Sequence, residues 1–254
     1  MPEAVKSAHR ALQIVGLFSE ETRPWSFQEM TDYLGYPRAS MHGLLETLVA
    51  DRWLAKDSST KRYSLGIKAF EAGAAYQRIN TLETLARRVM DRIRSDTGET
   101  VQLAVLDGLE AVYVAKAVGS RLLRLDSEVG SRLPAHATGV GKVLLSCLPE
   151  RELHERLEGV ELERLTERTI TTHAGLMDEL ASIRERGFAT DNEECTLGAR
   201  CVAVPVRRVD GSCAAAMSIS VPTAQHTAEL RQRLARDLRR GAEELSHQLV
   251  SSHM

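Results

Sequence analysis

Long apolar runs are missing from this 254-residue sequence. No stretch approaches the ~20 consecutive apolar residues that a membrane-spanning helix needs. The first ten residues, MPEAVKSAHR, are charged and lack the apolar core of a secretory signal. A membrane protein and a secreted protein are therefore not expected, and we expect the chain to act in the cytoplasm.

Cysteine is also scarce. The four cysteines, Cys147, Cys195, Cys201 and Cys213, include no C-x-x-C pair, and no histidine pair lies near them at a zinc-finger interval. We therefore expect reduced thiols that hold no metal. Nothing in the sequence calls for a cofactor or a metal ion.

An excess of charge of either sign is missing as well. The 33 Lys and Arg residues face 35 Asp and Glu residues, which gives a net charge of −2. Nucleic-acid-binding proteins usually carry a basic surface. Residues 1–65 are neutral too, so a DNA-binding function would depend on where a few basic side chains lie.

Two short helical patterns that meet at a tight turn are present in residues 26–50. Ser26 and Glu29 have the spacing of a capping box, in which each side chain bonds to a free backbone N–H at a helix start. Gly35 and Pro37 end the first helix and begin the second. The second helix carries an apolar stripe of Met41, Leu44, Leu45, Leu48 and Val49. Such a helix–turn–helix places its second helix in the DNA major groove.

Flanking segments extend this motif to a winged helix over residues 1–65. A preceding helix over residues 5–18 is predicted to have an inner face of Ala8, Ala11, Leu12, Val15 and Phe18. Short strands at residues 53–55 and 62–65 flank a polar turn and predict a hairpin, or wing. With the apolar stripe packed inward, the expected DNA contacts are Arg38, Ser40 and His42 in the groove, with Lys61 and Arg62 on phosphates.

The pattern changes after residue 65. Helices are predicted over residues 66–79 and 81–95, and the first is a plausible connector, although simple packing on its own domain explains it equally well. Antiparallel hairpins with flanking helices then continue to the C-terminus. We predict an α+β fold with a linker over residues 66–80 and a second domain over residues 81–254.

The hairpin of residues 201–221 separates small from bulky side chains. Val202, Val204 and Val206 alternate with Cys201, Ala203 and Pro205, and Met217, Ile219 and Val221 alternate with Ala216, Ser218 and Ser220. If the two small faces coincide, they leave space for a polar ligand of a few atoms. The alternative is a lightly covered face in contact with solvent.

Three other features allow more than one interpretation. The run Gly139-Val140-Gly141-Lys142 does not match a phosphate-binding P-loop. It suits either a small anion at a helix start or tight packing. The segment Asp191-Asn192-Glu193-Glu194 could supply ligand contacts, metal ligands or catalytic carboxylates, but such a cluster is also typical of a surface turn. Cys201 and His136 could form a nucleophile and base, although no third catalytic group is apparent.

Several separated motifs resemble those of IclR-type bacterial transcriptional regulators. They are residues 130–142 (GSRLPAHATGVGK), 186–194 (RGFATDNEE), 197–206 (LGARCVAVPV) and 217–222 (MSISVP). The resemblance implies a winged helix, a helical linker and a GAF-like effector domain. It also implies double-stranded operator DNA, a pseudo-palindromic site, a homodimer or homotetramer, and no enzymatic activity. The family often has a large polar or basic residue where this chain has Gly43.

The resemblance also implies an effector pocket for a small organic or aromatic acid. Carried over by matching positions, the lining is Leu122, Leu125, Leu133, Gly139, Val140, Asp191, Cys201, Ser218 and Ser220. A carboxylate beside ionised Asp191 would meet like charge, so we expect the acid group at the Gly139 and Val140 amides. The neutral N-terminal region leaves a second interpretation open, a small-molecule sensor whose helix–turn–helix contacts a protein.

Overall fold

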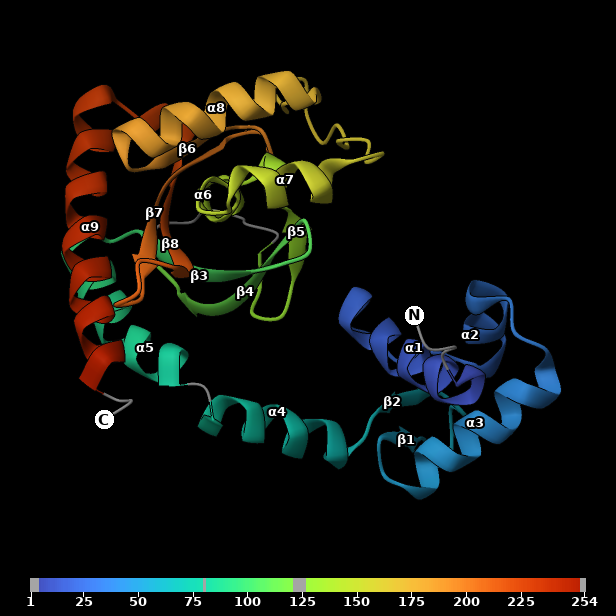
Figure 1. Cartoon of the computed structure of the whole chain (residues 1–254). Helices are drawn as coiled ribbons and strands as arrows, with labels where there is room; N and C mark the ends of the chain where they lie inside the picture. Colours follow the sequence, from blue (N-terminus) through green and yellow to red (C-terminus); the bar gives the residue numbers. More distant parts are fainter. Residues whose placement is uncertain (1–4, 80, 121–126, 252–254) are drawn as a thin grey trace. The chain divides into compact units, whose positions relative to one another are not determined.

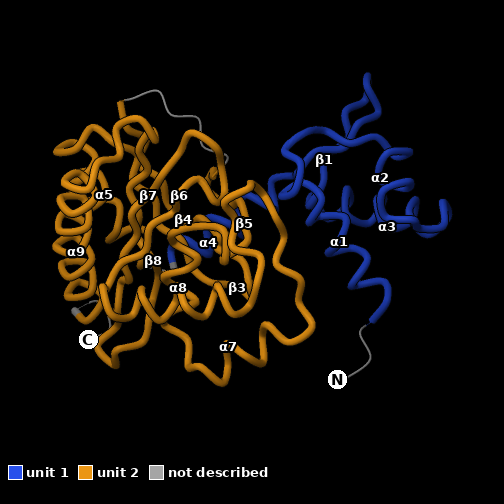
Figure 2. The backbone as a smooth tube through the Cα atoms, turned by 90° about the horizontal axis from the view of Figure 1, so that it is seen from above, with its two compact units in different colours: residues 1–80 blue, residues 81–254 orange. Residues whose placement is uncertain are grey.

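The computed structural model describes residues 5–79, 81–120 and 127–251. The chain divides into two compact units, residues 1–80 and residues 81–254 (Figure 2). Each unit has its own apolar core, and each is described by itself.

The first unit is a winged helix followed by a further helix. Its elements are α1 (Lys6–Glu20), α2 (Phe27–Leu34), α3 (Arg38–Ala50), β1 (Leu54–Lys56), β2 (Tyr63–Leu65) and α4 (Ile67–Ile79) (Figure 1). Strands β1 and β2 pair antiparallel, with Leu54 opposite Leu65. The predicted helix–turn–helix and wing are confirmed.

Local chemistry sets the limits of α2. The Glu29 carboxylate accepts the Ser26 N–H at 2.6 Å, and the Glu29 N–H donates to the Ser26 hydroxyl at 3.2 Å. This capping box supplies partners to two backbone N–H groups that have none within the helix. Gly35 then ends the helix with a φ of 65°, a conformation that glycine adopts without steric cost.

The inner face predicted for α1 was partly wrong. Leu12 is 72% exposed, whereas Ile14, Leu17 and Phe18 are buried. Both sets of residues fall at helical spacing, so the periodicity of this helix allows two overlapping stripes. The stripe that is buried is the one that packs with α3 residues Met41 and Leu45 in the common core.

The second unit contains a six-stranded antiparallel sheet. Its strands are β3 (Thr100–Asp107), β4 (Glu110–Ala117), β5 (Arg132–Pro134), β6 (Ala189–Asn192), β7 (Ala199–Arg207) and β8 (Cys213–Pro222). Their order across the sheet is β5-β4-β3-β8-β7-β6. Strands β3 and β8 therefore pair at the centre although more than 100 residues separate them in sequence.

Helices cover both faces of this sheet (Figure 1). They are α5 (Thr81–Thr97), α6 (Gly139–Ser146), α7 (Glu150–Leu157), α8 (His173–Arg186) and α9 (Ala228–Ser251), with short 3-10 turns η1 (Ala135–Ala137) and η2 (Thr223–Gln225). One apolar cluster lies between the sheet and the pair α5 and α9, and another between the sheet and α6, α7 and α8. The α+β prediction is confirmed. None of the helices in the described residues is long and apolar enough to span a membrane.

The register of β7 and β8 brings their small residues together. Cys201 lies opposite Ser220, and Ala203 lies opposite Ser218. The bulky residues Val202 and Ile219 are also partners, and they belong to the cluster beneath α5 and α9. Of the two possibilities that the sequence left open, the small faces do coincide, and they point toward α6.

Candidate functional site

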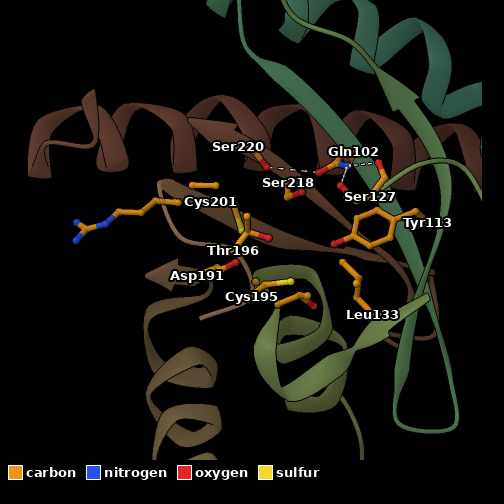
Figure 3. Close-up of a pocket in the computed structure, with 14 residues that line it drawn as sticks. Gln102, Tyr113, Ser127, Leu133, Asp191, Cys195, Thr196, Cys201, Ser218 and Ser220 are labelled. Carbon is orange, nitrogen blue, oxygen red and sulfur yellow. Dashed lines mark hydrogen bonds between the residues drawn. The ribbon is translucent and has the colours of Figure 1, made fainter. Parts of the chain in front are cut away.

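A pocket lies where the small faces of β7 and β8 meet the start of α6 (Figure 3). The space in this pocket is about 420 Å³ when the open solvent at its mouth is included. Of the residues predicted to bind an effector, six line it: Leu133, Gly139, Asp191, Cys201, Ser218 and Ser220. Val140 lies instead in the apolar core, 1% exposed. Leu122 and Leu125 are outside the described residues.

Other lining residues were missed at the sequence level. They are Gln102, Tyr113, Ser127, Thr138, Cys195, Thr196, Ala199 and Arg200. Gln102 is held at one end of the pocket, where its amide donates to the Ser127 carbonyl at 3.1 Å and accepts from the Ser220 hydroxyl at 3.4 Å. The alternation of side chains along β3 and β4 is the sequence signal that could have pointed to Gln102 and Tyr113. Alternation does not identify which strands become neighbours, so it could not place these residues in the pocket.

Most of the residues that line the pocket carry a side-chain group able to form hydrogen bonds. In Figure 3 the Tyr113 hydroxyl points into the space between Leu133 and the group of Asp191, Cys195 and Thr196. Burial raises the pKa of the Tyr113 phenol well above its ordinary value, so this hydroxyl stays protonated and can donate. Such a wall suits a small ligand with carboxyl, hydroxyl or keto oxygens.

Asp191 is the carboxyl group that lines this wall. Its residue is 8% exposed, and one carboxyl oxygen accepts the Glu194 N–H at 2.7 Å. Burial is the largest influence and raises the pKa of Asp191 from its usual 3.8 to about 7, although the Glu194 N–H acts in the opposite direction. Asp191 therefore takes up a proton much nearer neutral pH than an ordinary aspartate, and in its protonated form it can donate a hydrogen bond as well as accept one.

The acidic segment 191–194 is not an exposed surface turn. Glu194 is 6% exposed and binds Lys142, whose Nζ lies 2.6 and 2.7 Å from its two carboxylate oxygens. Lys142 is 1% exposed and lies 3.6 Å from a Glu179 oxygen as well. The lysine of the Gly-rich run is thus committed to a buried ion pair. No cluster of metal-binding side chains occurs among the described residues.

Close packing accounts for both glycines of this run. A Cβ at Gly139 would lie 2.5 Å from the Cys201 sulfur, and one at Gly141 would lie 2.3 Å from the Ala135 Cα. The Thr138 hydroxyl accepts the Gly141 N–H at 3.1 Å and caps α6. The Gly139 N–H contacts the Cys201 thiol, so a ligand would have to compete for that amide.

The nucleophile–base pair considered for Cys201 and His136 is absent. The His136 ring nitrogen Nε2 bonds to the Glu163 carbonyl at 2.9 Å, and His136 lines a different cavity beside α7. Burial raises the pKa of the Cys201 thiol. A thiol without an adjacent base and with a raised pKa is a poor nucleophile.

The residues predicted to enter the DNA groove lie near one another at the start of α3. Arg38 and His42 are exposed and Ser40 is half-buried. The Arg38 guanidinium donates to the Gln28 side chain at 2.6 Å and lies 5.3 Å from the Phe27 ring centre. Arg38 is therefore oriented by α2 rather than extended freely.

The two basic residues predicted for the wing differ in their pairing. Arg62 donates to the Glu29 carboxylate at 3.0 Å and to the Pro24 carbonyl at 2.9 Å. Glu29 is the capping-box residue of α2, so Arg62 ties the wing to that helix. Lys61 is exposed and has a φ of 58°, whereas Arg62 is half-buried.

Comparisons with known proteins agree with this architecture. Residues 74–247 match the family model "Bacterial transcriptional regulator IclR C-terminal", and residues 7–58 match the "IclR helix-turn-helix domain". The transcriptional regulator XynR of Escherichia coli is 36% identical over 221 residues, 87% of this chain and 88% of XynR. The E. coli regulator KdgR is 34% identical over 251 residues, 98% of this chain and 94% of KdgR. The crystal structure of Thermotoga maritima IclR has a TM-score of 0.76 at 31% identity, and the match covers 97% of this chain and 99% of that one.

Proposed function

Because the chain belongs to the IclR family of bacterial transcriptional regulators, we propose that its winged helix contacts operator DNA and that the pocket beside α6 holds the effector. The family consists of DNA-binding regulators with a ligand-binding C-terminal domain, so the chain is a regulator and not an enzyme. The proposed division is residues 1–65 for DNA binding, 66–80 as linker and 81–254 for the effector.

The proposal that this domain binds an effector rests on one observation, a polar pocket beside a buried carboxyl group. Hydroxyl groups of Tyr113, Ser218 and Ser220 reach one small space, and Asp191 has a pKa raised to about 7. A protonated Asp191 can donate to a carboxylate, which removes the like-charge conflict expected from the sequence. We therefore propose a small organic acid as effector, with Asp191 and the hydroxyls around its polar atoms.

The pH dependence of binding tests this arrangement. An acid effector should bind more weakly as the pH rises from 6 to 8, because Asp191 ionises and repels it. The Asp191→Asn variant should bind with little pH dependence over the same range. Calorimetry with a panel of small aliphatic and aromatic carboxylic acids measures this. Equal pH dependence in both proteins would refute the role of Asp191.

For the DNA half, we propose groove contacts from Arg38, Ser40 and His42 and phosphate contacts chiefly from Lys61, with a smaller share from Arg62. Their common position around the exposed start of α3 and the wing supports this. Such a neutral domain gains affinity by using two copies on a pseudo-palindromic site. A homodimer or homotetramer is therefore part of the proposal.

A gel-shift titration on the DNA upstream of this gene tests the DNA half. Arg38→Ala should weaken specific binding by about 1–3 kcal/mol, the contribution of a good base contact, with little effect on unrelated DNA. Arg151→Ala is the matched control, since it also removes one positive charge but lies on α7 with a 90% exposed side chain. Equal losses on specific and unrelated DNA would make Arg38 a phosphate contact. Absence of binding at low salt would favour the protein-contact alternative.

A further inference from the structure

Three basic side chains near the start of α9 bury nitrogen atoms that have no hydrogen-bond partner. They are Arg200 and Arg231 through Nε and His226 through Nε2. Buried polar atoms in folded proteins are nearly always bonded to protein, water or an ion. The Nε atoms of Arg200 and Arg231 always carry a hydrogen, so these two unpartnered nitrogens beside His226 point to a missing partner that accepts hydrogen bonds.

The fold brings these residues together from three segments. Arg200 lies near the start of β7, opposite Val221 of β8. The Thr223 N–H donates to the Gly198 carbonyl at 2.9 Å, which holds the turn η2 beside that end of β7. His226 follows η2 directly, and Arg231 lies in the first turn of α9. Arg200 also borders the effector pocket, so the cluster and the pocket adjoin at β7.

Positive charge is in excess around Arg200, His226 and Arg231. The Arg200 Nη2 lies 3.8 Å from a Glu193 oxygen, but Glu193 also accepts the Gly198 N–H and faces Arg168 at 3.5 Å. No ion pair joins Arg231 to any carboxylate of the described residues. Burial lowers the pKa of His226, and the charges of Arg200 and Arg231 lower it further. The Glu193 carboxylate is thus shared by two guanidinium groups, those of Arg168 and Arg200, and Arg231 adds a further positive charge.

We propose that Arg200, His226 and Arg231 form a second ligand site, for a small oxyanion of the phosphate class. A guanidinium presents several N–H donors in a plane that matches the oxygens of a phosphate group. The N-terminal end of α9 adds a favourable dipole. An oxyanion would give the orphan nitrogens an acceptor and would offset the repulsion at His226. This site shares Arg200 with the wall of the effector pocket, whereas His226 and Arg231 do not line that pocket, and the proposal does not depend on the effector's identity.

Thermal unfolding and calorimetry of the full chain test the proposal with inorganic phosphate as the probe. Potassium chloride at equal ionic strength and pH is the reference. The melting temperature should rise with the logarithm of phosphate concentration, beyond any effect of chloride. Arg231→Gln and Arg200→Gln should each weaken phosphate binding at least ten-fold. Arg233→Gln, which removes an exposed arginine of the same helix, should leave binding unchanged.

The imidazole of His226 provides a second readout that does not require a stability change. In a carbon-detected NMR titration of the wild-type protein, phosphate should raise the pKa of His226, because the bound anion favours the imidazolium form. Glycerol 3-phosphate is the second probe, and much tighter binding than inorganic phosphate would identify the source as a phosphorylated metabolite. An unmoved His226 pKa, no stabilisation beyond chloride, or an equal loss in Arg233→Gln would each overturn the site.

Discussion

The buried ion pair of Lys142 and Glu194 allows a sharp prediction. Lys142 lies at the end of the Gly-rich run, and its Nζ is 2.6 and 2.7 Å from the Glu194 oxygens. Substituting Lys142→Met keeps the apolar stem of the side chain, one atom shorter, but leaves the Glu194 carboxylate buried without a cation. Glu179 retains Arg186 at 2.6 Å, so the uncompensated charge is that of Glu194.

The magnitude follows from the cost of an unpaired buried charge. Removing one partner of a buried pair typically costs 3–5 kcal/mol. For a unit of this size, each kcal/mol corresponds to a fall of about 2–4 °C in melting temperature. We therefore expect Lys142→Met to lower the Tm of the second unit by roughly 6–20 °C. Urea unfolding followed by circular dichroism measures the free energy directly.

Two further variants make this test specific. In the double variant Lys142→Met with Glu194→Gln, neither charge of the pair remains, and the amide oxygen can still accept the Asn192 N–H that Glu194 accepts at 3.1 Å. Most of the lost stability should return. Arg151→Met breaks an exposed pair with Glu155 at 2.8 Å and should cost at most about 1 kcal/mol. A loss below about 1 kcal/mol for Lys142→Met, or no recovery in the double variant, would refute the reasoning.

Further predictions concern stability and DNA binding. Burial raises the pKa of Asp191 to about 7, so wild type should lose up to about 4 kcal/mol relative to Asp191→Asn as the pH rises from about 4 to about 7; parallel urea-unfolding profiles would contradict this. Gly141→Ala should cost about 1–3 kcal/mol in the same assay, because the new Cβ would lie 2.3 Å from the Ala135 Cα. Gly43→Ala, a helical position with open space around it, should instead stabilise by up to about 1 kcal/mol, and a loss there would indicate an unseen contact. Lys61→Ala should reduce the salt dependence of DNA binding by about one phosphate contact, and an unchanged slope would remove Lys61 from the DNA surface.

Much of the fold could be predicted because its signals are local. The capping box of Ser26 and Glu29 and the stop at Gly35 act within a few residues, and both occur as expected. The alternation in β7 and β8 likewise gave each strand a small and a bulky face, but the register that places the two small faces together came only from the structure. The prediction of the inner face of α1 was partly wrong, because its periodicity allows two overlapping apolar stripes. Packing with α3 determines which stripe is buried.

The candidate site could be predicted only in part. The sequence motifs supplied Asp191, Cys201, Ser218 and Ser220, and these lie together in one pocket. They did not supply Gln102 or Tyr113, because the pairing of β3 with β8 joins strands more than 100 residues apart. Such a pairing depends on the whole sheet and leaves no local pattern.

The sequence by itself determined the helix–turn–helix, the wing, the strand faces and the family, since each depends on short-range geometry or on motifs. Tertiary structure alone decided the electrostatics. It buried Asp191 and so raised its pKa, and it paired Lys142 with a carboxylate 52 positions away. It also brought together Arg200, His226 and Arg231, each of which has a buried nitrogen without a hydrogen-bond partner. The reason is physical: the energy of a charge depends on its burial and on the charges around it, and both are set by segments that meet only in the folded protein.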